Sequence, residues 1–412
     1  MESSNFIRKF YYTLPNNQLI LPCQYGIRCK NRSNCPYWHN PMIKIVPLCR
    51  YGSKCQKQGQ TCPYSHDMGY QGAVACEYGL SCTNEKCKNI HPIEANKTVI
   101  GKYNLLYKAV HCTLRLNTRL FDIIVFDSSK LLCANLTQVL NLNYEIDIDR
   151  ERYMFATNHI YQIFSNHKLG GGTLGYGNLQ EEKIMLTSSL LQYLLHNSHH
   201  DNESPLSNNL EQYPIVVNTM VVVKDNSYIN YQHNSDSPHY GRSGLALAYN
   251  KEVVNYLYNT IDNPIPIKAM CIAVPKLKNC DGSCYNETLL VNIFQTLYKA
   301  FVTSIIADIN EASTNDCHIH IGNIGCGAFG HNYNTIFVLQ YLAIGCAYQF
   351  IKPTKNFFIK YHAYDDKTYN GLTTTAIPAL KSWMFSGKNI KTILSELRNN
   401  QILVPDLWAK KL

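Results

Sequence analysis

The stretch HIYQIFSNHKLGGGTLGYGNLQEE, residues 159–182, decides the fold of the longer part of this chain. Its first six residues are mostly β-branched or aromatic, which predicts a strand at 159–164. Three glycines, Gly170, Gly171 and Gly172, follow this strand, and the apolar periodicity after them predicts a helix that starts at Gln180. A strand, a glycine-rich loop and a helix in this order indicate an α/β unit, in which ligands bind at the strand end.

A second stretch of the same kind, HIHIGNIGCGAFG, covers residues 318–330. A strand expected at 318–321 leads into a glycine-rich loop and then into a helix expected at 335–350. Glycines between a strand and a helix let backbone N–H groups approach a diphosphate, and the helix N-terminus favours its charge. One such turn is weak evidence for a ligand site, but two in equivalent positions are a much stronger indication.

Strands and helices alternate through the rest of this region, which predicts an α/β domain with a mixed sheet covered on both faces. His318 and His320 alternate on one strand face, where partly buried strand histidines are the preferred interpretation over a metal site. The other expected strands are 120–126, 214–223, 265–274 and 357–362, and the other expected helices are 180–196, 288–309 and 374–400.

The N-terminal part carries a different pattern, in which cysteine and histidine recur at regular spacing. Each of three units has the order Cys, five residues, Cys, four to six residues, Cys, three residues, His. A unit this short cannot bury a core, whereas three thiolates and one imidazole complete a tetrahedral shell around one structural zinc ion. The expected ligands are Cys23, Cys29, Cys35 and His39, then Cys49, Cys55, Cys62 and His66, then Cys76, Cys82, Cys87 and His91.

These units resemble CCCH zinc fingers, a family that mostly binds single-stranded RNA. Cys-x-Tyr-Gly at the first cysteine of each unit, as in 23–26, strengthens the resemblance. RNA binding also agrees with the residues, because aromatic side chains stack on unpaired bases and cations contact phosphates. Residues 1–100 hold twelve Lys and Arg against five Asp and Glu, a charge of +7 out of +9 for the whole chain. Docking to a protein or to another polymer is the alternative.

Length and composition limit the class of protein. The chain has 412 residues, of which 45% are hydrophobic and 16% charged, so wholesale disorder is excluded and two or three folded units are expected. Polar residues such as Asn292 and Lys299 interrupt the most apolar stretch, so no membrane span is expected. We expect an intracellular protein, cytoplasmic or nuclear, with zinc fingers at 20–95, a linker at 96–117 and the α/β domain at 118–412.

The glycine loops also resemble those of a known enzyme family. The three glycines, seven further residues and Gln-Glu-Glu at 180–182 are similar to the signature of poly(ADP-ribose) glycohydrolases. GNIGCGAFG, residues 322–330, resembles the other phosphate loop of that family, and the similarity covers about residues 118–365. The resemblance implies a macrodomain fold. The expected architecture is therefore a small zinc-finger array followed by an α/β macrodomain-like domain with a mixed sheet between helices.

The resemblance also implies a mechanism that needs no metal. Glu182 would protonate the leaving ribose oxygen of a ribose–ribose bond and then deprotonate the attacking water, while Glu181 would hold the ribose hydroxyls. Without the flanking motifs, these two glutamates would be interpreted as a solvated first helical turn. The residues that the resemblance assigns to substrate binding are Asn166, Gly170, Gly171, Gly172, Gln180, Gly325, Cys326, Gly327, Ala328 and Phe329.

The implied activity is hydrolysis of poly(ADP-ribose) to ADP-ribose, with the zinc fingers targeting the enzyme to RNA. One alternative is an enzyme that removes single ADP-ribose groups from proteins or nucleic-acid ends. The other is an RNA-binding regulator whose macrodomain only recognises ADP-ribose.

Overall fold

The computed structural model covers the α/β domain in several segments. The described residues are 105–106, 108–109, 124–140, 145–173, 179–191, 193–194, 209–222, 264–277, 285–309, 316–327 and 329–399. The expected zinc ligands and Ala328 lie outside them.

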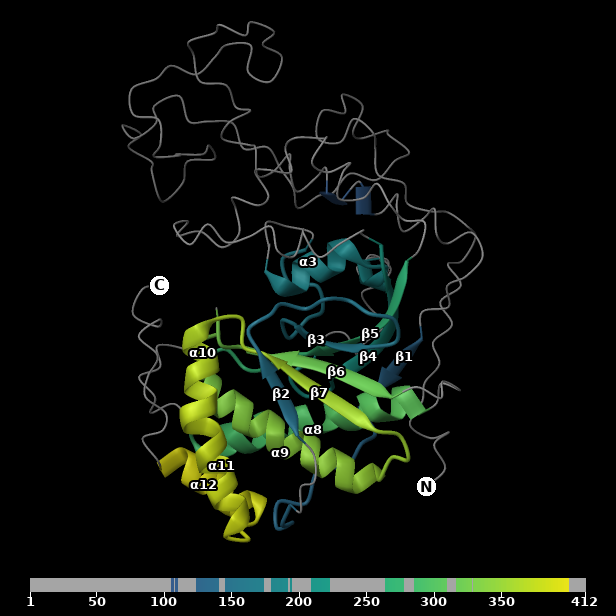
Figure 1. Ribbon diagram of the computed structural model, residues 1–412. Helices are drawn as coiled ribbons and strands as arrows, with labels where there is room; N and C mark the ends of the chain where they lie inside the picture. The colour runs from purple at the N-terminus through teal and green to yellow at the C-terminus, as the bar shows by residue number, and fades with distance from the viewer. Residues whose placement is uncertain are drawn as a thin grey trace, which may run out of the picture.

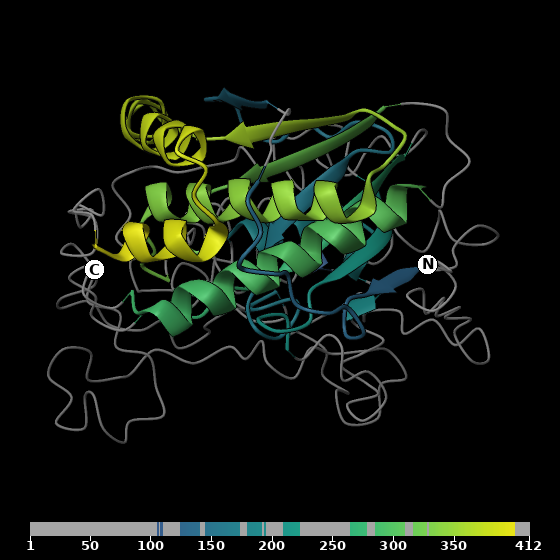
Figure 2. The ribbon, with the colours of Figure 1, turned by 90° about the horizontal axis from the view of Figure 1, so that it is seen from below.

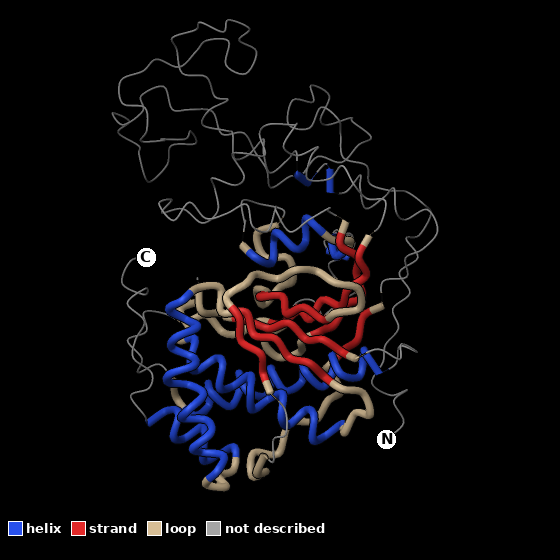
Figure 3. The backbone as a smooth tube through the Cα atoms, viewed as in Figure 1, coloured by secondary structure: helices blue, strands red, loops and turns tan. Residues whose placement is uncertain are grey.

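Within the described residues, seven strands form one mixed sheet in the order β1-β4-β5-β3-β6-β7-β2. From β5 to β2 all neighbouring strands run parallel, and β4 and β1 continue the sheet in antiparallel pairs. Figure 3 shows the strands in red and the surrounding helices in blue, so the predicted mixed sheet is confirmed. The strands are β1 (Val125–Asp127), β2 (Ile146–Asp149), β3 (Ile160–Phe164), β4 (Ile215–Val221), β5 (Ile265–Ile272), β6 (Cys317–Gly322) and β7 (Phe357–His362).

Helices cover both faces of this sheet, as Figures 1 and 2 show. The long helices α8 (Glu287–Ile309) and α9 (Tyr333–Ile351) pack side by side on one face, and α3 (Gln180–Thr187) lies over the other. Alternate side chains of a strand enter different layers: in β5, Met270 joins the core on the α8 and α9 side, and Ala269 joins the core under α3.

The sequence analysis found no stretch apolar enough to span a membrane, and the helices α8 and α9 correct that point. Each of these helices is long and apolar enough to cross a membrane by length and composition alone. Most of the apolar window of each is buried inside the domain, where the two helices pack on each other and α8 packs on the sheet. Such burial is typical of the core helices of a globular domain.

The helix expected at 180–196 is interrupted. It ends at Thr187, because Ser188 has an extended backbone and forms a bridge to Val221 of β4. The Ser188 hydroxyl donates a 2.7 Å hydrogen bond to the carbonyl of Ile184, and helical conformation returns at Leu190. Pairing with the sheet has therefore overridden the helical periodicity.

Two further differences concern the ends of the sheet and of the domain. The sequence prediction missed β2, whose Ile-Asp-Ile-Asp sequence is half exposed at the sheet edge and is recognisable only by its pairing with β7. The helix expected at 374–400 is divided, because Gly387 adopts a left-handed conformation with φ 65°. The C-terminal elements are α10 (Asp366–Gly371), the π-helix η7 (Leu372–Ala376), α11 (Ile377–Phe385) and α12 (Ile390–Asn399).

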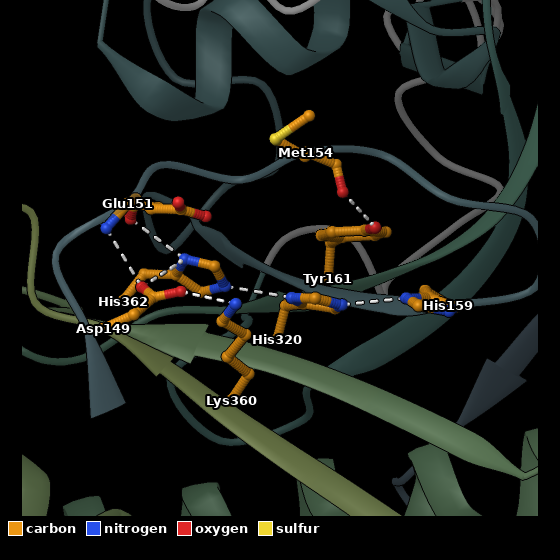
Figure 4. A network of polar contacts seen from close by, with 8 residues as sticks. All are labelled: Asp149, Glu151, Met154, His159, Tyr161, His320, Lys360 and His362. Atoms are coloured by element: carbon orange, nitrogen blue, oxygen red, sulfur yellow. Dashed lines mark hydrogen bonds and ion pairs between the residues drawn. The ribbon is translucent and has the colours of Figure 1, made fainter. Parts of the chain in front are cut away.

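Three histidines form a hydrogen-bonded row that begins directly before β3 and crosses β6 and β7 (Figure 4), which we call the histidine chain. His159 Nδ1 lies 2.9 Å from His320 Nε2, and His320 Nδ1 lies 2.9 Å from His362 Nε2. His362 Nδ1 must donate to the carbonyl of Glu151 at 2.9 Å, because a carbonyl only accepts. His362 Nε2 then accepts from His320, and His320 Nε2 accepts from His159. A single carbonyl thus fixes every ring of the neutral row in the Nδ1–H form.

His320 and His362 are buried and His159 is half-buried, which agrees with a neutral histidine chain. Burial lowers the pKa of His320 to about 3 and that of His159 to about 4, with the neighbouring histidines adding to the effect. Both ring nitrogens of His320 are used within the row, and the described part of the chain contains no group of three or more His, Cys, Asp or Glu that could bind a metal ion. The interpretation of His318 and His320 as partly buried strand histidines is confirmed.

Candidate active site

Both glycine-rich loops lie at the same edge of the sheet. The first follows β3 and the second follows β6, and these strands are parallel neighbours. Because the carboxyl ends of parallel strands meet at one edge of a sheet, the topology places the two loops next to each other at that edge. The side chains and backbone atoms of each loop determine what this edge can bind.

The glycines of the first loop hold two glutamates from the start of α3. Glu181 accepts hydrogen bonds from the N–H of Gly170 at 2.7 Å and of Asn166 at 3.1 Å, one on each carboxylate oxygen. Glu182 accepts from the N–H of Gly172 at 2.9 Å and of Leu179 at 2.8 Å. The sequence predicts that the N–H groups of the loop glycines face a ligand, but in this structure those of Gly170 and Gly172 bind the carboxylates. The sequence expectation is corrected on this point.

Only glycine fits in the centre of this loop. Gly171 has φ 43°, and a Cβ atom added there would lie 2.5 Å from Oε2 of Glu181 and 2.9 Å from Oε1 of Glu182. Gly170 has φ 94°, and a Cβ atom there would lie 2.5 Å from a methyl group of Leu194. Positive φ and the lack of space together explain why the sequence has a run of glycines here.

Burial separates this pair from an ordinary first helical turn. Glu181 is 3% exposed and Glu182 is 6% exposed, so the alternative of a solvated turn is wrong. Burial raises the pKa of Glu181 to about 8, and the charge of Glu182 adds to the increase, although the N–H donors of Gly170 and Asn166 oppose it. A carboxyl group with this pKa holds a proton at neutral pH.

The side chains of Gln180 and Asn166 form hydrogen bonds to the backbone of the protein. Gln180 Oε1 accepts from the N–H of Phe164 at 2.8 Å, and its Nε2 donates to the carbonyl of Gln162 at 2.9 Å. The Gln180 amide therefore joins α3 to the end of β3, instead of facing a ligand as expected. Asn166 is half-buried, and its Oδ1 accepts from the N–H of His167 at 2.7 Å.

The second loop is fixed at its base and open at its centre. The N–H of His331 donates to the carbonyl of Gly325 at 3.0 Å, which closes the loop. Gly325 has φ 72°. Among the described residues, the N–H groups of Gly325, Gly327 and Phe329 have no hydrogen-bond partner. Backbone donors in such a turn form a concavity that suits an anion. Phe329 is partly buried against the core, and Cys326 is also partly buried.

Sequence analysis missed His331 and Tyr285, which hold the second loop in place. His331 Nε2 donates to the carbonyl of Pro275 at 2.6 Å, so its Nδ1 accepts from the Tyr285 hydroxyl at 3.0 Å. The same hydroxyl accepts from the N–H of Asn332 at 2.9 Å. Burial lowers the pKa of His331 to about 4. A histidine directly after a glycine-rich loop was the available signal.

Comparison with known proteins supports the zinc-finger interpretation. The model of the RNA-binding, Nab2-type zinc finger family matches residues 22–39, 48–66 and 75–92. Each segment contains one complete set of the expected ligands, so the prediction of three CCCH zinc fingers is confirmed. Three thiolates and one imidazole are also the donor set that zinc prefers. The comparison with curated proteins gives no match.

Several solved structures of poly(ADP-ribose) glycohydrolases are similar to this chain. The enzyme from Thermomonospora curvata bound to the inhibitor ADP-HPD has 13% sequence identity and a TM-score of 0.38, over 66% of this chain and 94% of that chain. The enzyme from Deinococcus radiodurans in complex with ADP-ribose has 15% identity and a TM-score of 0.30, over 51% and 70% of the two chains.

Proposed function

We propose that the α/β domain is a macrodomain-type poly(ADP-ribose) glycohydrolase, which hydrolyses ribose–ribose bonds and releases ADP-ribose. The observation that carries the proposal is the pair Glu181 and Glu182, buried at the carboxyl edge of the sheet and held by the N–H groups of Gly170 and Gly172. The spacing of these residues in the sequence is that of the glycohydrolase signature.

The proposed reaction divides the work between the two glutamates. Glu182 protonates the ribose oxygen that leaves when the glycosidic bond breaks, and then takes a proton from the water that attacks the anomeric carbon. Glu181 orients the ribose through its hydroxyls, and because its pKa is raised to about 8 the pair holds one shared proton at neutral pH, which Glu182 delivers to the leaving oxygen. Each carboxyl group is already fixed by two backbone donors, so neither has to reorganise during the reaction.

The second loop supplies the diphosphate site in this proposal. The N–H groups of Gly325, Gly327 and Phe329 would donate to the phosphate oxygens, with Cys326 and Ala328 completing the loop backbone. The N-terminus of α9 follows this loop directly, and its dipole favours negative charge. The loop lies at the same sheet edge as the glutamate pair, so one ADP-ribose unit can contact both.

We further propose that the three zinc fingers bind single-stranded RNA, as the description of their family implies, and direct the hydrolase to RNA or RNA–protein assemblies. Zinc would have a structural role in them, because short units of this kind fold only around the ion. Docking to a protein or to poly(ADP-ribose) itself is the competing function of the fingers.

The experiment that tests the proposal measures free ADP-ribose released from poly(ADP-ribose) by the purified protein and by its Glu182→Gln and Glu181→Gln variants. We expect the wild type to release ADP-ribose and Glu182→Gln to bind ADP-ribose without turnover. For Glu181→Gln we expect weaker binding as well. A wild type that binds ADP-ribose without cleaving the polymer would replace the proposal with a reader domain. Turnover restricted to mono-modified protein would instead identify a mono-ADP-ribosyl hydrolase.

A further inference from the structure

β3 and β6 separate at the edge where the two glycine-rich loops begin. Their ladder has only two pairs, Ile160 with Ile319 and Tyr161 with His320. On the other side of each strand the pairing continues further: β3 pairs with β5 as far as Phe164, and β6 pairs with β7 as far as Gly322. The sheet is therefore opened between its two central parallel strands, directly below the proposed ligand.

Glutamine side chains occupy this opening and satisfy the backbone groups that the ladder leaves. Gln162 Oε1 accepts from the N–H of Gly322 at 3.1 Å, and Gln162 Nε2 donates to Gln340 Oε1 at 2.8 Å. Gln340 Nε2 donates to the carbonyl of Gly322 at 2.9 Å, which closes a ring of three hydrogen bonds. Both glutamine side chains are fully buried. A buried amide without these partners would be strongly destabilising.

The backbone of Gln162 connects the same ring to the glutamate pair. Its carbonyl accepts from Gln180 Nε2 at 2.9 Å and from the Tyr153 hydroxyl at 3.1 Å. Gln180 is the first residue of α3 and directly precedes Glu181. One residue of β3 thus contacts the start of α3 on one side and the start of the second loop on the other.

We propose that Gln162 is a positioning residue that sets the separation between the glutamate pair and the second loop. The inference rests on the proposed function, in which one ADP-ribose unit contacts both. An apolar side chain would fill the same volume, but it would leave the N–H of Gly322 without a hydrogen bond and would not fix the orientation of that peptide group. The two amides give this opening a fixed width, because each of their three hydrogen bonds must keep its length and direction.

The test compares the Gln162→Met variant with a control variant that loses two amide hydrogen bonds elsewhere in the domain. Methionine keeps the length of the side chain and removes both hydrogen bonds. The control is Gln295→Met: the Gln295 amide accepts from the N–H of Ala134 at 2.7 Å and donates to its carbonyl at 3.1 Å, outside both loops. Melting temperature, the kcat and KM for poly(ADP-ribose), and the affinity for ADP-ribose are measured for both variants and for the wild type.

We expect Gln162→Met to lower kcat by about 10 to 100-fold, since small misplacements of catalytic groups have effects of this size. Gln295→Met should keep the kcat of the wild type even where the two variants lose similar thermal stability. An unchanged kcat in a folded Gln162→Met protein would overturn the inference. If Gln162→Met does not fold, Gln340→Met opens the same ring from α9 and is judged by the same comparison.

A wild type without glycohydrolase activity would remove the proposed function but would still allow this inference to be judged. The readout is then the hydrogen exchange of the amides of Gly170 and Gly172, which bind the two glutamates. Faster exchange in Gln162→Met than in Gln295→Met would show that Gln162 positions the pair. Equal exchange in the two variants would overturn the inference independently of activity.

Discussion

The electrostatic coupling of the glutamate pair gives a quantitative prediction: replacing Glu182 by glutamine lowers the pKa of Glu181. A Cβ atom on Gly171 would lie 2.5 Å from Oε2 of Glu181 and 2.9 Å from Oε1 of Glu182, so these oxygens are at most 5.4 Å apart, the sum of the two contacts. Two unit charges about 5 Å apart repel each other by about 3 kcal/mol at an effective dielectric constant of about 20. That energy corresponds to about two pKa units.

Burial is the larger cause of the raised pKa of Glu181, and the variant does not remove it. The charge of each carboxylate is also shared by two oxygens, one of which lies further from the partner. We therefore expect a decrease of about one to two units from the value of about 8, to a pKa that stays above the ordinary range of glutamate. The folded protein would then hold the Glu181 proton only below about pH 6 to 7.

The assay is a carboxyl ¹³C NMR titration of Glu181 in the wild type, in Glu182→Gln and in Glu287→Gln. Glu287 is an exposed acid at the start of α8, and its removal should leave the titration of Glu181 unchanged. The coupling argument would be refuted if Glu182→Gln left the pKa of Glu181 where it is in the wild type. The same result would contradict a shared proton in the proposed mechanism.

Three other predictions address the loop, the histidine chain and the zinc fingers. Gly171→Ala should abolish turnover and destabilise the domain by about 1 to 3 kcal/mol, because strain at positive φ is joined by a clash with the glutamates. Gly387→Ala, also at positive φ but with open space around it, should show the strain alone and keep full activity. The pKa values of the histidine chain are lowered in the folded protein, so the unfolded state binds more protons between about pH 6.5 and 4. The free energy of unfolding should therefore fall as pH falls through this window. Denaturation measured at several pH values should show a steeper fall in the wild type than in the His320→Asn variant. Chelation should release about three zinc ions and unfold residues 20–95, seen by proteolysis, while ADP-ribose affinity is kept; loss of both would contradict separate modules.

The local sequence predicted most elements that depend on neighbouring residues. The spacing of cysteine and histidine identified the zinc fingers, because a metal shell is satisfied by ligands close together in the chain. The glycines after β3 and β6 marked both loops, because positive φ favours glycine whatever surrounds it. Strand and helix types followed from periodicity, except where pairing decided the outcome, at Ser188 and in β2.

Only the tertiary structure decided how these pieces act together. The sequence placed Gly170 and Gly172 near a ligand, but the fold aims their N–H groups at Glu181 and Glu182. The sequence analysis also assigned no role to Gln162, because the function of a single amide in an apolar strand depends on Gly322 and Gln340, which only the fold places beside it. Burial, and with it the raised pKa of Glu181, is a property of residues that are distant in the chain and packed together in space. Spacing along the chain therefore identified the chemistry, and long-range packing determined its geometry and its charge state.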